Sequence, residues 1–291
     1  MKFALVDAEK ASYRVTRICA WLEVSRAGYY AWRKRKPSAR QQQDERLKVA
    51  VLAAHSTGRG NYGSPRIHRE LRDEHDIHTG IRRVTRLRRD LQLKARIRRR
   101  YKHTTVSDHD QPIFPNILEQ KFDATAPNER WVGDTTELLV GEHGVKLYLA
   151  VILDLFARFV VGWALSARND RHLVMKAMDM ALRRRRPKQG LIFHSDQGSP
   201  YASEDHQKLL AAHGVISSMS RRGNCYDNAA MESWFSTYKA ELGERFSSDA
   251  EVKDKTFDYI EAFYNTTRRH SALDYMSPAR YERAAEQKRA A

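Results

Sequence analysis

The chain has 291 residues, of which 41% are hydrophobic, so it can form two or three domains with a substantial core. No stretch approaches the ~18 apolar residues of a membrane span, and the N-terminus lacks the apolar segment of a signal peptide, so the sequence predicts a cytoplasmic protein. Its two cysteines, Cys19 and Cys225, are too few for a disulfide framework or a cysteine-based zinc site.

The net charge is +16, and it is unevenly distributed along the chain. Residues 1–123 contain 28 basic and 14 acidic side chains, a balance of +14, whereas residues 124–291 contain 24 and 22, a balance of +2. Basic charge concentrated in one part of a chain favours a polyanionic partner such as nucleic acid over a merely solubilising surface.

Residues 1–38 have the pattern of a helix-turn-helix. Ile18 and Leu22 mark a short helix, and Ser25 is suited to cap a second helix that ends in the basic run RKRK. The polar stretch 36–43 contains a proline and is interpreted as a linker.

Residues 44–105 repeat this helical pattern and predict a second helix-turn-helix-like DNA-binding domain. Ser64 and Pro65 suit the cap and first position of one helix. The next helix has an apolar stripe formed by Ile81, Val84, Leu87 and Leu91. Five arginines cover the rest of it: Arg82, Arg83, Arg86, Arg88 and Arg89. Such a helix suits a DNA groove, and we expect Arg82, Arg83, Arg86 and Arg89 to contact DNA. The histidines of this region, with no cysteine among them, are interpreted as surface residues rather than metal ligands.

A linker is predicted over residues 106–127, a catalytic core over 128–270 and a tail over 271–291. In the core, three closely spaced β-rich segments precede an alternation of helix and strand. This order predicts an α/β layer with a mixed five-stranded sheet. The segment 249–270 is predicted to be a single helix.

Three acidic residues of the core have unusual surroundings. Asp134 lies within the first strand, where aspartate is disfavoured, and Asp196 ends the fourth strand, where the sites of α/β sheets collect. Glu232 lies among apolar residues on a later helix, for which Asn228 is a candidate cap. If the first and fourth strands are adjacent, the three carboxylates can converge, and their repulsion would favour two bound Mg²⁺ ions and phosphodiester chemistry.

Asp154 and His194 are two further polar residues of the predicted core whose pattern also fits a structural role. Asp154 also ends an apolar run, but it lies at a hairpin, where turn capping explains it. His194 is close to Asp196 in sequence and fits a structural role at a strand end as well as a role in the site.

The acids belong to a recognisable pattern: 35 residues separate Asp196 from Glu232, and Lys239 follows seven residues later. This spacing resembles the D,D(35)E signature of retroviral integrases and related transposases. The stretches WVGDTTEL, HSDQGSPYAS, SRRGNCYDNAAMESWFSTYKAEL and YNTTRRHSALDYMSPARYE resemble the second-reading-frame, catalytic protein of a large bacterial insertion-sequence transposase family. GYYAWRKR and GNYGSPRIHRELR extend the resemblance into the N-terminal part.

The resemblance implies a ribonuclease-H-like core and a polynucleotidyl transferase that cuts DNA at element ends and joins 3′-hydroxyls to new DNA. It implies Mg²⁺, with Mn²⁺ as a substitute, bound by Asp134, Asp196 and Glu232. It also implies action on terminal inverted repeats and target DNA by a homo-oligomer in the bacterial nucleoid. A first-frame helix-turn-helix protein, fused or separate, is the further partner that it suggests.

Other basic residues are expected at the DNA backbone. Lys239 shares a helix face with Glu232 and is expected to contact phosphate near the scissile bond. The remaining expected backbone contacts are Arg221, Arg222, Arg268, Arg269 and His270. Two alternatives stay open: a DNA-binding regulator without catalysis and a metal-dependent nuclease without strand transfer.

Overall fold

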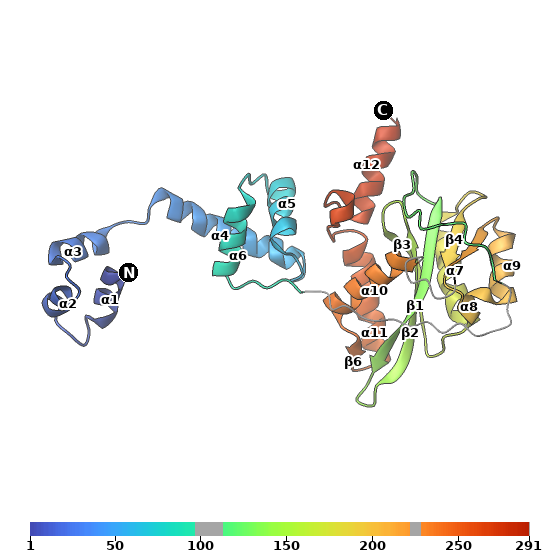
Figure 1. The fold of residues 1–291 in the computed structure, drawn as a ribbon, viewed down its shortest axis with the longest axis horizontal. Coiled ribbons are helices and arrows are strands. Elements are labelled where there is room, and N and C mark those ends of the chain that lie inside the picture. Colours follow the sequence, from blue (N-terminus) through green and yellow to red (C-terminus); the bar gives the residue numbers. More distant parts are fainter. Residues whose placement is uncertain (97–112, 222–227, 291) are drawn as a thin grey trace.

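The computed structural model describes residues 1–96, 113–221 and 228–290. Figure 1 shows three parts: a small N-terminal helical unit, a second helical unit, and a sheet covered by helices on both faces.

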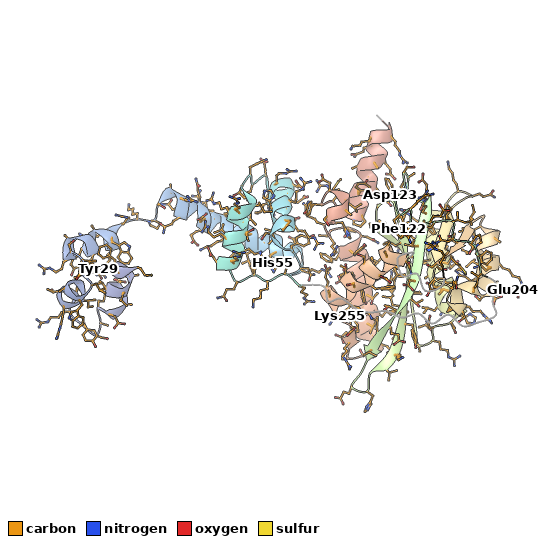
Figure 2. The ribbon with its side chains drawn as sticks, in the orientation of Figure 1. Tyr29, His55, Phe122, Asp123, Glu204 and Lys255 are labelled. Carbon is orange, nitrogen blue, oxygen red and sulfur yellow. The ribbon has the colours of Figure 1, made fainter. Side chains whose placement is uncertain are left out.

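The N-terminal unit consists of three helices. They are α1 (Lys2–Glu9), α2 (Val15–Trp21) and α3 (Arg26–Lys34). The predicted cap is confirmed, because Ser25 Oγ accepts a hydrogen bond from the backbone N–H of Gly28 at 3.0 Å. Helix α1 was not predicted. Its Val6 packs in a small separate core with Ile18, Cys19 and Tyr29, and Figure 2 shows Tyr29 between the helices.

The second unit, called here the α4–α6 unit, contains α4 (Ala39–Thr57), α5 (Ser64–His75) and α6 (Ile81–Asp90). The predicted linker at 36–43 is wrong, because α4 begins within it. Ser38 Oγ accepts from the N–H of Gln41 while Gln41 Oε1 accepts from the N–H of Ser38, which is a complete capping box. The predicted cap of α5 is wrong by one residue, since Gly63 is the cap and Ser64 is already helical.

The sheet has the predicted mixed topology. Its strands are β1 (Arg130–Val140), β2 (Val145–Asp154), β3 (Phe159–Ser166), β4 (Ile192–Ser195), β5 (Ile216–Met219) and the two-residue β6 (Arg245–Phe246). The order is β3-β2-β1-β4-β5, and β6 pairs with the far end of β1. The first three strands are antiparallel, whereas β4 and β5 run parallel to β1.

Helices cover both faces of the sheet (Figure 1). One face is covered by α7 (Arg171–Arg185), α8 (Ser199–Ala202) and α9 (Glu204–Ala212), and the other by α10 (Ala229–Leu242) and α11 (Asp249–Phe257). Side chains alternate along β1, so Trp131 packs in the α7 core while Val132 and Leu138 pack in the α10 core. Because Asp134 has the parity of Val132, it faces α10.

The C-terminal part is more structured than predicted. The single helix expected at 249–270 is instead α11 followed by a π-helix, η2 (Asp258–Tyr264). The expected tail forms a 3₁₀ turn, η3 (Ser271–Leu273), and helix α12 (Pro278–Ala290), because Glu282 of α12 is buried against Arg185 of α7. Among the helices of the described ranges, none is long and apolar enough to cross a membrane.

Candidate active site

Strand pairing brings two of the predicted acids to the same point of the sheet. Val132 of β1 is the register partner of His194 of β4, and the two strands are parallel. Two residues further along each strand lie Asp134 and, immediately after β4, Asp196. The adjacency that the sequence prediction required is therefore present.

Asp134 has a raised pKa because of its surroundings. Burial, followed by the negative charge of Asp196 and then that of Glu232, raises the pKa of Asp134 well above its ordinary value. A hydrogen bond from the N–H of Thr135 to Asp134 Oδ1, at 2.7 Å, acts in the opposite direction. The charges of Asp196 and Glu232 therefore both act on Asp134.

A tight turn holds Asp196. The N–H of Gly198 donates to Asp196 Oδ1 at 3.0 Å. A Cβ atom at position 198 would lie 2.9 Å from the same oxygen, so a side chain there would push the carboxylate away. The sequence DQG thus fixes the acid at the end of β4.

Glu232 lies in the first turn of α10, where the helix dipole favours an acidic side chain. The apolar neighbours that surround it in sequence attach α10 to the sheet: Ala230, Met231, Trp234, Phe235 and Tyr238. Asn228 is at the predicted N-cap position of the helix, but its side chain makes no capping hydrogen bond with the described residues.

Tyr201 is part of the site and was not predicted from the sequence. Its hydroxyl lies 3.6 Å from the position that a Cβ atom on Gly133, the residue before Asp134, would occupy, on the α7 side of β1. Burial and then the charges of Asp134 and Asp196 raise the pKa of Tyr201 well above its ordinary value, so the phenol stays protonated. The signal was its place in HSDQGSPY, five residues after Asp196.

His194 and Asp154 have structural surroundings. The buried His194 ring is hydrogen bonded to Ser218 Oγ at 2.9 Å and Ser220 Oγ at 3.1 Å, which ties β4 to β5. Asp154 accepts from the N–H groups of Phe156, at 3.0 Å, and Asn128, at 2.8 Å. The interpretation of Asp154 as a turn-capping residue is confirmed.

The three acids offer carboxylate oxygens, the donors that Mg²⁺ prefers. The pKa of Asp134 is raised first by burial and then by the charges of Asp196 and Glu232, and a bound cation would relieve the part that comes from these charges. Within the described ranges, however, no three acidic, histidine or cysteine side chains already form a group able to hold a metal ion. The donor chemistry of the three acids fits a divalent cation.

Comparison with known proteins places this site in a family. The integrase core domain family matches residues 124–225, and again 213–278, and the HTH-like domain family matches residues 42–101. Transposase InsF for insertion sequence IS3A of Escherichia coli is 38% identical over 97% of this chain and 98% of its own length. An uncharacterized 31 kDa protein of insertion element IS600 from Shigella sonnei is 44% identical over 91% of this chain and 97% of its own length.

The chain belongs to the IS3 family of insertion-sequence transposases. The predicted ribonuclease-H-like fold of its core is confirmed by the integrase-core match and the sheet order. Among solved structures, the HTLV-2 integrase catalytic core in complex with magnesium aligns over 54% of this chain and 98% of that one, at 15% identity. Its TM-score of 0.40 is too low to inform the chemistry of this transposase.

The arginines of α6 that were expected to contact DNA differ in whether they form an ion pair with Asp44. Arg82 and Arg89 are exposed. Arg83 Nε donates to Asp44 Oδ1 at 2.7 Å, and Arg86 Nη2 donates to Asp44 Oδ2 at 2.5 Å, so both join α6 to α4. Of the expected DNA contacts on α6, Arg82 and Arg89 therefore lie in the position that DNA can reach without breaking an ion pair with Asp44.

Two expected DNA contacts are instead buried inside the transposase, which corrects the sequence interpretation. The side chain of Arg268 is 2% exposed and forms a two-point ion pair with Glu241 of α10. The side chain of Arg269 is 4% exposed and binds acids of α5. His270 packs edge-on against Tyr264 with 4.8 Å between ring centroids. Burial against carboxylates gives both arginines a structural role, because binding phosphate would leave buried acids unpaired.

The remaining basic residues differ in accessibility. Lys239 lies on α10 with its side chain 11% exposed and its Nζ 3.9 Å from Glu244. Burial lowers its pKa, although Glu244 and Glu137 act in the opposite direction. Arg221 is exposed at the end of a described range, and Arg222 lies outside the described residues.

Proposed function

We propose that this chain is a DDE transposase that cuts DNA at the ends of an insertion sequence and joins the freed 3′-hydroxyls to target DNA. The observation that carries the proposal is that Asp134 and Asp196 lie at matching positions of the paired strands β1 and β4, and that the charges of both Asp196 and Glu232 act on Asp134. Carboxylates grouped in this way suit metal-assisted in-line displacement at a phosphodiester.

Asp134, within β1, and Asp196, directly after β4, would hold divalent metal ions, Mg²⁺ or Mn²⁺, and Glu232 would complete the ligand set from α10. Two such ions, when bound, activate the attacking oxygen and stabilise the leaving oxygen. Tyr201 is buried in the core on the opposite face of β1, where its phenol would keep bulk water from that side of the acids. Lys239 would contact a DNA phosphate from the same helix as Glu232.

DNA would be held by the basic N-terminal part of the chain. In the α4–α6 unit, Arg82 and Arg89 are the proposed phosphate contacts, and Arg221 is a further one near the site. We also propose that the transposase acts on chromosomal DNA as a homo-oligomer that pairs two element ends, with or without a first-frame helix-turn-helix partner.

The test is a strand-transfer assay on the element's own terminal repeats with Mg²⁺, in the presence and absence of the first-frame protein. Asp134→Ala, Asp196→Ala and Glu232→Gln should each abolish cleavage and joining, because each removes a proposed metal ligand, while DNA binding survives. Joining at the wild-type rate by purified Glu232→Gln protein would show that the site is assigned wrongly. Cleavage without joining by the wild-type protein would instead favour a hydrolytic nuclease.

A further inference from the structure

Two consecutive arginines connect parts of the molecule that are far apart in sequence. Arg268 donates from Nε to Glu241 Oε2 at 2.8 Å and from Nη2 to Oε1 at 2.6 Å. Glu241 lies on α10, nine residues after Glu232. Tyr259 also donates its hydroxyl to Glu241 Oε2, at 2.9 Å, so the end of α10 is held from η2.

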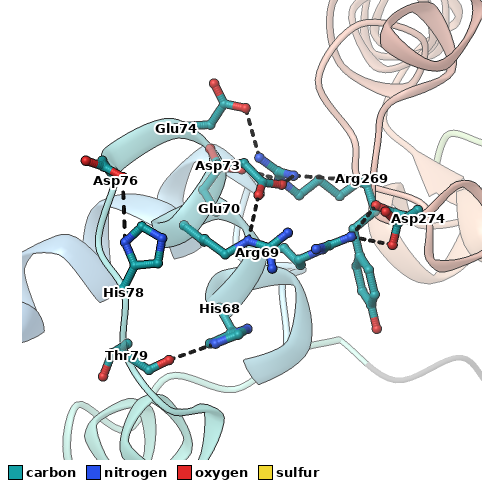
Figure 3. Close-up of polar contacts among 12 residues, drawn as sticks. His68, Arg69, Glu70, Asp73, Glu74, Asp76, His78, Thr79, Arg269 and Asp274 are labelled. Carbon is teal, nitrogen blue, oxygen red and sulfur yellow. Dashed lines mark hydrogen bonds and ion pairs between the residues drawn. The ribbon is translucent and has the colours of Figure 1, made fainter. Parts of the chain in front are cut away.

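The next residue binds the α4–α6 unit. Arg269 contacts three acids of α5: Glu70 through Nε, Asp73 through Nη1 at 2.7 Å and Glu74 through Nη2 at 3.0 Å. Its backbone N–H donates to the hydroxyl of Tyr62 at 2.9 Å. Figure 3 shows Arg269 entering this group of acids from the C-terminal part of the chain.

Further contacts make this a specific interface. Arg69 of α5 binds Asp274, and Arg59 Nη2 donates to Asp258 Oδ1 at 3.0 Å. Arg96, just after the α4–α6 unit, donates to the backbone carbonyl of Glu241. The apolar core of the unit is also contiguous with the core between the sheet and α10.

The buried ion pairs of Arg268 and Arg269 hold this interface together more strongly than the exposed pairs do. Burial alone would lower the pKa of Arg268 and of Arg269, but the bonds to Glu241 and to Glu70 raise both pKa values above the ordinary value, so both arginines stay charged. A buried charge network has few alternative arrangements, since separating its members would leave charges without solvent or partners. Exposed pairs such as Arg280 with Glu74 contribute much less.

From these contacts we propose that Arg268 and Arg269 form a positioning device that links the α4–α6 unit to α10. DNA bound by the unit thereby sets the position of Glu232 relative to Asp134 and Asp196. The inference rests on the proposed function for its catalytic consequence, but the mechanical link stands on the contacts themselves.

The deciding experiment is hydrogen exchange of the full-length protein with and without a short DNA duplex at low salt. In the wild type, DNA should slow exchange of the α10 amides. Arg269→Gln should bind the same duplex with similar affinity, because Arg82 and Arg89 are untouched, yet lose this protection. Single-turnover cleavage at saturating DNA should fall about tenfold in this variant, a usual size for coupling between two sites.

Two variants separate coupling from loss of folding. Arg280→Gln removes a partner of the same Glu74 from an exposed position, and it should respond to DNA like the wild type. Glu70→Gln with Arg269→Gln removes both buried charges, and it should regain thermal stability without regaining the α10 response. An unchanged α10 response in a folded Arg269→Gln protein would overturn the proposal. A normal α10 response in a wild-type protein that never cleaves would count against the proposed function and leave the coupling intact.

Discussion

Asp134 is a residue of the candidate site whose environment is expected to lower the stability of the fold. Asp134 is held among other carboxylates, and its pKa is raised by burial and by Asp196. Functional sites are where such unfavourable charge arrangements concentrate. The same residue should therefore weaken the fold and be required for activity.

The pH dependence of this cost has a definite sign. The folded state binds the proton of Asp134 more tightly than the unfolded state does, so its penalty is absent below the ordinary pKa of 3.8 and grows as pH rises through the folded value. Asp134→Asn should thus stabilise the metal-free protein at neutral pH by about 1 kcal/mol, or about 2–4 °C in Tm. The gain should disappear in acid.

Thermal unfolding across this pH range measures the effect, and Mg²⁺ provides the control. The ion should raise the Tm of the wild type, because it compensates the clustered charge, and have little effect on Asp134→Asn. A variant less stable than the wild type at neutral pH would mean that Asp134 is a stabilising acid and not a repelled one.

The role of a residue could be predicted from the sequence when it depends on local pattern, and not when it depends on partners far away in the chain. The approach of Asp134 and Asp196 could be expected on the condition that the first and fourth strands pair, and the structure meets that condition. The roles of Arg268 and Arg269 did not, because their partners lie 27 and 199 residues away in sequence. Nothing in the local pattern TTRRH distinguishes a buried ion pair from a phosphate contact.

At the level of elements, the strands and long helices were predictable, and irregular parts were not. Alternating β-rich segments gave the mixed sheet, because side-chain period and turn spacing are local properties. The start of α4 was missed although Ser38 and Gln41 form a standard capping box, since Pro37 suggested a linker. The π-helix at 258–264 has no local sequence signal, and its buried aromatic residues fix it through tertiary packing.

The exposed and the ion-paired arginines of helix α6 are expected to differ in their effect on DNA binding. Arg82→Gln and Arg89→Gln should each weaken binding to duplex DNA and reduce the slope of log affinity against log salt by about one, because each removes one phosphate contact. Arg83→Gln is the matched control on the same helix. It should keep the slope but lower Tm, because it leaves Asp44 with one fewer partner. Titrations at several salt concentrations distinguish the two groups, and a slope change confined to Arg83→Gln would reverse the assignment.

In the whole molecule, the excess of positive charge and the candidate catalytic acids lie in different parts of the chain. The basic excess lies before residue 124, while the acid site lies in the nearly neutral remainder. The α4–α6 unit shares a continuous core with the sheet, whereas the α1–α3 unit has a small core of its own. Figure 1 shows the α1–α3 unit standing apart from the rest of the chain. Changes in the α4–α6 unit should therefore affect the sheet and its candidate site more than changes in the α1–α3 unit do.

A chain beginning at Pro37 tests this separation. It lacks nine basic and three acidic residues, so it should bind duplex DNA more weakly and with a shallower salt dependence. Because the α1–α3 core is separate, the thermal transition of the remaining molecule should stay unchanged, and so should exchange protection of α10 by saturating DNA. Affinity measured against salt gives the first result, and calorimetry with hydrogen exchange gives the second. An unaltered salt slope would mean that the α1–α3 unit does not contact DNA, and its exposed surface would then be free for a protein partner.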